Sequence, residues 1–167
     1  MSAPSEAEAG ERPRLAVRSA QPADYPRLID IWRDAVELTH HFLTPADIDW
    51  YETVVRDYLP QMLDLRVAID GGTDVLGFIA QSGGDIHMLF VDPAAHGRGV
   101  GTLLLETVGA QFDLLRVDVN EDNASGRRFY QARGFEQVGR SATDDQGRPF
   151  PLLHLQRDSR PSTAVAS

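Results

Sequence analysis

The chain has 167 residues, the size of one ordinary domain, and a formal net charge of −9 from 25 acidic and 16 basic residues. It contains no cysteine, which excludes disulfides, thiolate zinc sites and a cysteine-linked acyl intermediate. All 16 basic residues are arginine, which excludes an ATP-binding Walker A lysine, a Schiff-base lysine and pyridoxal phosphate chemistry. The acidic balance disfavours nucleic acid and anionic membranes as partners and modestly favours cationic ones.

The two ends of the chain differ in composition from its body. Residues 1–13 and 157–167 are rich in small and polar residues, and we expect disordered tails there. Residues 14–156 contain no repeat and no linker, which predicts a single domain. The acidic N-terminus lacks the apolar core of a secretory signal, and no apolar run approaches the roughly 20 residues of a membrane-spanning helix. We therefore expect a cytoplasmic protein.

Strand-like and helix-like patterns alternate along the body of the chain. Helices are indicated by apolar residues at helical spacing and by capping residues such as Thr44 and Asn123, and strands by short apolar runs between turn residues. In chain order we expect a strand at 15–18, helices at 25–39 and 45–59, strands at 65–70, 75–82 and 85–91, a helix at about 102–111, a strand at 114–120, a helix at about 124–133, and strands at 135–143 and 150–156.

The order of elements is therefore β-α-α-β-β-β-α-β-α-β-β. It predicts a mixed α/β (α+β) fold with a mostly antiparallel central sheet flanked by helices. A β-α-β crossover around the third helix predicts that parallel pairing is confined to the two strands on either side of it.

A glycine-rich segment, HGRGVG at 96–101, lies between an expected strand and an expected helix. A dinucleotide fingerprint needs G-x-G-x-x-G; here the third glycine comes one position early, and too little chain follows Asp118 to complete such a domain. An ATP-binding loop would need the missing lysine. The amides of residues 97–102, at a helix N-terminus, would instead form an anion nest that suits a pyrophosphate, with Gly99 and Gly101 allowing close approach.

Two stretches of the chain resemble the GNAT superfamily of N-acetyltransferases. LFVDPAAHGRGVGTLLLETV is similar to the family's strand, V-x-P and [Q/R]-x-x-G-x-[G/A] helix start, although His96 stands where Gln or Arg is usual. VNEDNASGRRFYQARGF is similar to a family strand ending near Asn, a second Asn and a helix carrying F-Y and G-F. THHFL together with PLLHL resembles a group of small, single-domain bacterial acetyltransferases.

The resemblance implies an N-acetyltransferase that moves the acetyl group of acetyl-CoA directly to a primary amine, on a small molecule or a peptide, in a ternary complex that releases CoA. Dimers are common in the family, so a homodimer is possible. Independently of the resemblance, five histidines without a cysteine and without an H-x-x-x-H or similar pair do not suggest a metal site. The alternative is a CoA- or acyl-CoA-binding module without efficient catalysis.

The family's cofactor contacts fall on the expected third strand and on the glycine-rich segment. Strand backbone groups would pair with the pantetheine arm, and loop amides would hold the pyrophosphate. The implied cofactor-binding residues are Leu89, Phe90, Val91, His96, Gly97, Arg98, Gly99, Val100, Gly101, Thr102, Asn123 and Arg127. For Asn123 a plain helix cap, and for the arginines a solvated surface charge, remain alternatives.

Tyr130 is the implied general acid, with its hydroxyl beside the thioester sulfur; its alternative is a core aromatic. The candidate base is Asp85, at the strand position where some family members carry Glu. Strand alternation predicts that Asp85, His87, Leu89 and Val91 share one face, so that His87 could act with Asp85 as base or proton relay. The alternative is that Asp85 merely ends the preceding turn.

His40, His41 and Phe42 lie between the first two expected helices, which in this family overhang the acceptor site. They are candidate acceptor-binding residues or a second candidate for the base, and the alternative is a helix C-terminus whose carbonyls the histidines cap. His154, on the last expected strand, either lines the acceptor pocket near Trp32 or Tyr51 or sits satisfied in the sheet.

Overall fold

The computed structural model describes residues 14–161, which contain a seven-stranded sheet and four α-helices. The strands are β1 (Leu15–Ser19), β2 (Asp64–Asp70), β3 (Asp74–Ser82), β4 (Asp85–Val91), β5 (Leu114–Asn120), β6 (Glu136–Ser141) and β7 (Leu152–Asp158). The helices are α1 (Tyr25–Thr39), α2 (Pro45–Tyr58), α3 (Val100–Gly109) and α4 (Ala124–Ala132). The predicted order of elements is confirmed.

The sheet has the strand order β1-β2-β3-β4-β5-β7-β6. Every neighbouring pair is antiparallel except β4 and β5, as predicted from the crossover. The parallel pairing is short, because it covers only Asp85↔Arg116 and Ile86↔Val117. Beyond Ile86, β4 pairs with β3 alone, so its other edge opens onto a gap in the sheet.

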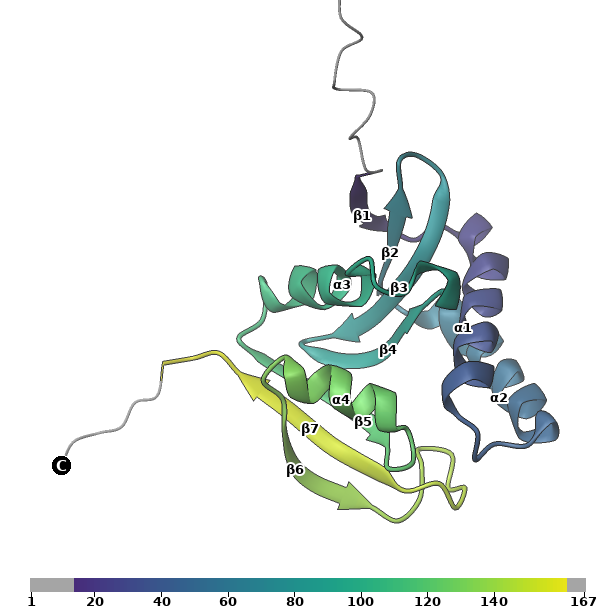
Figure 1. Ribbon diagram of the computed structural model, residues 1–167, viewed down its shortest axis with the longest axis vertical. Helices are drawn as coiled ribbons and strands as arrows, with labels where there is room; N and C mark the ends of the chain where they lie inside the picture. The colour runs from purple at the N-terminus through teal and green to yellow at the C-terminus, as the bar shows by residue number, and fades with distance from the viewer. Residues whose placement is uncertain (1–13, 162–167) are drawn as a thin grey trace, which may run out of the picture.

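Helices cover both faces of the sheet and divide the core into two clusters. One cluster joins α3 and α4 to β3, β5 and β7, and the other joins α1 and α2 to β2 and β3. Figure 1 shows α1 and α2 at the right of the sheet, and α3 and α4 on its other side. Helices from both faces of the sheet therefore lie near the gap between β4 and β5.

The start of α2 shows how local sequence fixes the connection beside this gap. The Thr44 hydroxyl accepts a hydrogen bond from the Asp47 amide at 3.1 Å, and the Thr44 amide donates to the Asp47 carboxylate at 3.0 Å. Pro45 occupies the first helical position, where its missing N–H has no intrahelical partner to lose. This capping box sets where α2 begins after the turn that follows α1.

The predicted boundary of the C-terminal tail at residue 157 is wrong. Strand β7 continues to Asp158, and the Arg157 guanidinium lies 3.0 Å from the Glu106 carboxylate and 3.1 Å from the Arg133 carbonyl. Arg157 thus links β7 to α3 and to the end of α4, a tertiary role that composition does not reveal. The predicted tail at 1–13 lies outside the described residues. Within residues 14–161, no helix has the length and apolar character needed to cross a bilayer.

Candidate active site

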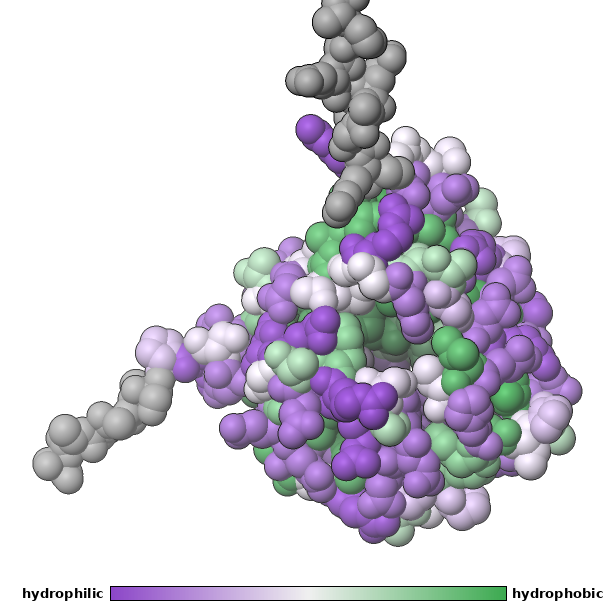
Figure 2. Space-filling view, in the orientation of Figure 1, coloured by the Kyte–Doolittle hydropathy of each residue, from purple (hydrophilic) through white to green (hydrophobic). Residues whose placement is uncertain are grey.

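Two adjoining cavities lie around the gap between β4 and β5. The larger, of about 500 Å³, is enclosed by α1, α2, β4 and the connection between β6 and β7. The smaller, of about 320 Å³, lies between the diverging ends of β4 and β5, against the start of α3 and one side of α4. Figure 2 shows a hollow with hydrophobic walls near the centre of this face.

The two cavities meet at a shared wall. The residues that line both are His40, Ile86, His87, Met88, Phe90, Asp118, Asn120 and Leu152. They come from the end of α1, from the two strands that diverge, and from the start of β7. Groups held in the two cavities would therefore meet beside this wall.

A β-bulge in β4 lies at the same point. Ala80 pairs with Met88 and the next residue, Gln81, pairs with Ile86, so His87 is the extra residue of β4. The bulge breaks the side-chain alternation: Ile86 packs in the cluster that Leu89 and Val91 contact, whereas Met88 and Phe90 contact the other cluster. The prediction that Asp85 and His87 share a face with Leu89 and Val91 is therefore wrong.

The glycine-rich segment forms a bend that leads into α3. Gly97 and Gly99 have φ angles of 81° and 77°, in the left-handed region that glycine adopts without a side-chain penalty. In the described part of the chain, the N–H groups of residues 97–102 donate to no backbone or side-chain acceptor. Six free amides at a helix N-terminus create a site with positive potential that can hold an anion.

Half of the implied cofactor residues line the smaller cavity: Leu89, Phe90, Val91, His96, Gly101 and Asn123. Asn123 also caps α4, because its side-chain oxygen accepts from the Gly126 amide at 3.0 Å.

The other implied cofactor residues have different surroundings. Gly97 and Gly99 belong to the bend, and the Val100 side chain is buried in the core. The Arg98 guanidinium lies 3.1 Å from the Asp70 carboxylate. The Thr102 hydroxyl accepts from Arg133, and Arg127 donates to the Glu121 carbonyl at 3.2 Å. Any role of these residues in anion binding thus rests on their backbone amides or on rearranged side chains.

Tyr130, on α4, lines the smaller cavity while only 7% of its surface is exposed. Its ring packs edge-on against Phe129 and Phe135, so Tyr130 belongs to the core and also lines the cavity. Burial raises the pKa of the Tyr130 hydroxyl, which therefore stays protonated. No other described residue forms a hydrogen bond with this hydroxyl. A protonated donor thus faces the smaller cavity.

His40, at the end of α1, is buried and lines both cavities. The Thr39 hydroxyl donates to the Ala35 carbonyl at 2.8 Å and lies 2.7 Å from His40 Nδ1, so Nδ1 carries the proton that completes this contact. Burial, assisted by the nearby His41, lowers the pKa of His40 to about 4. His40 is therefore neutral near pH 7, and its Nε2 is a hydrogen-bond acceptor.

The two candidate bases on β4 differ in position. Asp85 lines neither cavity and lies 3.7 Å from Arg116, which places it outside the shared wall. His87 belongs to that wall, and its Nε2 lies 2.5 Å from the Ser82 hydroxyl. The structure therefore brings His87, but not Asp85, to the place where the cavities meet.

The remaining predicted acceptor residues do not line either cavity. His41 is exposed, and Phe42 packs its ring between His40 and Phe150. His154 lines neither cavity and instead has both ring nitrogens partnered within the sheet, the alternative expected for it: its Nδ1 lies 2.6 Å from Asp118 and its Nε2 lies 2.6 Å from the Ser141 hydroxyl. The reason is the strand order, which places β7 next to β5.

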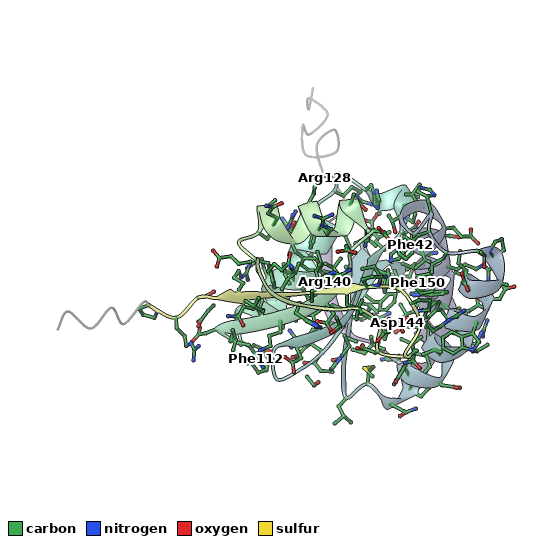
Figure 3. All side chains as sticks on the ribbon, turned by 90° about the horizontal axis from the view of Figure 1, so that it is seen from below. Phe42, Phe112, Arg128, Arg140, Asp144 and Phe150 are labelled. Atoms are coloured by element: carbon green, nitrogen blue, oxygen red, sulfur yellow. The ribbon has the colours of Figure 1, made fainter. Side chains whose placement is uncertain are left out.

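The connection between β6 and β7 supplies site residues that the sequence did not reveal. The Tyr51 hydroxyl donates to the Asp144 carboxylate, and Arg148 bonds Asp47 at 2.7 Å with its guanidinium 4.4 Å from the centre of the Trp50 ring. Figure 3 shows Phe42, Phe150 and Asp144 close together, with Arg128 on the outer side of α4. The connection is thereby fastened to α2 and closes one side of the larger cavity.

The larger cavity combines an acidic part with an apolar wall. Asp118, Asp144 and Asp145 contribute carboxylates. Burial raises the pKa of Asp145, and Asp118 and Asp144 raise it further, because the three carboxylates lie close to one another. The apolar wall is formed by Trp32, Val36, Leu43, Tyr51, Val54, Tyr58, Met62, Met88, Phe90, Phe150 and Leu152. Within residues 14–161, no group of three or more His, Asp or Glu side chains is arranged to hold a metal ion.

Comparison with known proteins places this geometry in a family. The family model described as an acetyltransferase (GNAT) domain matches residues 48–151. The peptidyl-lysine N-acetyltransferase YjaB of Salmonella typhimurium is 37% identical over 141 residues, which cover 84% of this chain and 97% of that protein. YjaB of Escherichia coli K12 is 36% identical over 84% of this chain and 95% of its own length.

Solved structures agree with this assignment. The solution structure of apo-form YjaB from Escherichia coli has a TM-score of 0.81 and 35% identity, covering 86% of this chain and 97% of that one. The structure of yncA from Salmonella typhimurium with its cofactor acetyl-CoA shares the fold, with a TM-score of 0.62, 19% identity and coverage of 90% and 97%. The chain therefore belongs to the GNAT family and is an N-acetyltransferase.

Proposed function

We propose that this enzyme transfers the acetyl group of acetyl-CoA directly to the side-chain amine of a peptide lysine. The observation that carries the proposal is the wall shared by the two cavities, beside which a donor in one could meet an acceptor in the other. The names of the YjaB relatives, peptidyl-lysine N-acetyltransferases, agree with this acceptor.

Acetyl-CoA fits the smaller cavity and the bend beside it. Six free amides at residues 97–102 suit a pyrophosphate, and the edge of β4 that faces away from β3 can pair with the amide groups of a pantetheine arm. The arm would then run between β4 and β5 toward Tyr130 and the shared wall. In this arrangement the thioester supplies the activated acetyl group, and the backbone of the chain provides most of the contacts.

A lysine side chain fits the larger cavity. Its four methylenes match the apolar wall between Trp32 and Phe90, and its amine matches the carboxylates at Asp118 and Asp144. Neutral His40 offers Nε2 as an acceptor for an amine N–H, which would orient the nitrogen lone pair toward the acetyl carbon.

Tyr130 is proposed as the general acid that protonates the departing thiolate. Its hydroxyl faces the cavity, has no other partner in the described chain, and is kept protonated by burial. Because the chain has no cysteine to carry an acyl group, the amine should attack the thioester directly. Initial-rate kinetics should therefore show intersecting lines, and parallel lines would contradict direct transfer.

A thiol-release assay with matched peptides tests the acceptor. One peptide has a single lysine and a blocked N-terminus, the second replaces that lysine by arginine, and the third has no lysine but a free N-terminus. Only the first should release CoA quickly, and mass spectrometry should find the acetyl group on its lysine. Since the enzyme itself contains no lysine, it adds no side-chain background to this measurement. Faster turnover of the third peptide or of a small polyamine would refute the proposed acceptor.

A further inference from the structure

Asp118 is the one carboxylate in the described chain that lines both cavities. It lies on β5, one residue beyond Val117, where the pairing with β4 ends. A carboxylate at this position is adjacent to any amine that enters the larger cavity and attacks a thioester in the smaller one. The position of Asp118 follows from the fold, and the role proposed for Asp118 rests on the proposed function.

Behind Asp118, two further polar side chains continue toward the surface. Asp118 Oδ1 lies 2.6 Å from His154 Nδ1, and His154 Nε2 lies 2.6 Å from the Ser141 hydroxyl. The side chain of His154 is 35% exposed. The three residues come from neighbouring strands β5, β7 and β6, so the sheet itself holds them in line.

Gly139 explains how the imidazole fits across β6. Gly139 pairs with His154, and a Cβ at this position would lie 3.2 Å from His154 Cδ2. The absence of a side chain lets the ring lie over the β6 backbone and reach Ser141. The imidazole is thus held at both nitrogens, with one side toward the cavities and the other toward solvent.

We propose that Asp118 takes the proton from the attacking amine and that His154 carries it onward to water. The amine nitrogen bonds to the acetyl carbon, the carbon–sulfur bond breaks, and the thiolate takes a proton from Tyr130, whose phenolate is then reprotonated from water. The new N–C bond makes the nitrogen acidic, and its proton passes to Asp118. Asp118 gives a proton to His154 Nδ1, while Nε2 releases one through the Ser141 hydroxyl to water. Asp118 is the catalytic residue, and His154 is a positioning residue that acts through it.

The charges around this path are mostly negative. Asp144 and Asp145 approach from the connection between β6 and β7, His87 from β4, and the Arg116–Asp85 pair from the adjacent strands. Asp118, Asp144 and His154 all act on Asp145, which places them within one electrostatic neighbourhood. The proposed path therefore runs through a region dominated by carboxylates.

Four variants test the relay. Asp118→Asn should lower kcat at least about 100-fold, the usual contribution of a general base, with acetyl-CoA affinity unchanged in calorimetry. It should also weaken binding of the lysine peptide to the CoA-bound enzyme by about tenfold, because a charge-assisted hydrogen bond is lost. His154→Ala should lower kcat about tenfold. Ser141→Ala should have a smaller effect than either. Gln156→Ala, the next residue on the same face of β7, is the control and should behave like the wild type.

Added imidazole separates a relay from a merely structural role. The space left by His154→Ala is partly open to solvent, so imidazole should restore turnover in proportion to its neutral form, and should do nothing for Gln156→Ala. The relay is overturned if Asp118→Asn retains kcat within threefold, or if His154→Ala is impaired but not rescued. If the wild type prefers other amines and Asp118→Asn still lowers kcat with those amines, the proposed acceptor is refuted and the relay is supported. Unchanged peptide binding in Asp118→Asn would overturn the contact between Asp118 and the amine without reference to turnover.

Discussion

The buried His40 makes the stability of the fold sensitive to acid. In the unfolded chain an imidazole titrates near pH 6.5, whereas burial lowers the pKa of His40 to about 4. Between these values the unfolded chain binds a proton that the folded chain does not, so the free energy of unfolding falls as the pH falls. This contribution is fully present above about pH 6.5 and is lost by about pH 4.

The size of the effect follows from the pKa difference. At about 1.4 kcal/mol per unit, full titration costs about 3 kcal/mol, and the loss between pH 7 and pH 5 is about 2 kcal/mol. Such a loss is a large part of the usual stability of a domain of this size.

Urea unfolding of wild type and His40→Gln at several pH values measures this contribution. Carboxylates titrate in both proteins, so the difference between them isolates His40. Relative to wild type, His40→Gln should gain about 2 kcal/mol when the pH is lowered from 7 to 5. His41→Gln is the matched control: His41 is exposed and makes only the smaller contribution to the shift, so this variant should follow the wild-type curve closely. A difference between wild type and His40→Gln that does not change with pH would refute a neutral, buried His40.

Four further substitutions probe the two cavities. Tyr130→Phe should lower kcat by about 100-fold while the Kd of acetyl-CoA, measured by calorimetry, stays within twofold; unchanged turnover would remove Tyr130 from the mechanism. Gly99→Ala introduces a side chain at a φ of 77°, costs about 1–2 kcal/mol, and should weaken acetyl-CoA binding several-fold; equal affinity would show that the bend is not the anion site. Arg148→Ala should raise the KM of the amine several-fold but not that of acetyl-CoA, because it frees the β6–β7 connection from α2; equal changes in both would argue against a separate acceptor cavity. His96→Gln should leave acetyl-CoA affinity intact, and an affinity that weakens as the pH rises in the wild type alone would show that His96 binds phosphate as a cation.

Local signals were sufficient to predict most of the fold. Helix α1 has the predicted bounds, and α2 starts at Pro45 because Thr44 and Asp47 form a capping box that is readable from four consecutive residues. Glycine turns separate the strands, and the element order identified the single parallel pair. These features depend on neighbours in sequence, which is why periodicity and caps reveal them.

The errors arise from strand pairing and tertiary contacts that periodicity and capping residues do not specify. The bulge at His87 depends on how β4 pairs with β3, and simple alternation assumes a regular ladder. The contact of His154 with Asp118 depends on the insertion of β7 between β5 and β6, which the order of elements along the chain does not specify.

The fastening of the β6–β7 connection was not predictable either. Its contacts with α2 join residues 93 and 101 positions apart, and its sequence resembles an ordinary turn. Likewise, the sequence marks Tyr130 only as an aromatic beside Phe129; the proposal that its hydroxyl is the proton donor rests on the resemblance to the family and on the cavity that Tyr130 lines.

The short pairing between β4 and β5 has a mechanical consequence. The sheet consists of two parts, here called ladders. The N-terminal ladder contains β1, β2, β3 and β4, and the C-terminal ladder contains β5, β7 and β6. Only two residue pairs join them. Small rotations of one ladder against the other break few hydrogen bonds, so this seam is the expected hinge of the domain. A molecule bound in the gap contacts both ladders and stiffens that hinge. Ligand binding should therefore slow amide hydrogen exchange across the whole C-terminal ladder, including residues that do not contact the ligand.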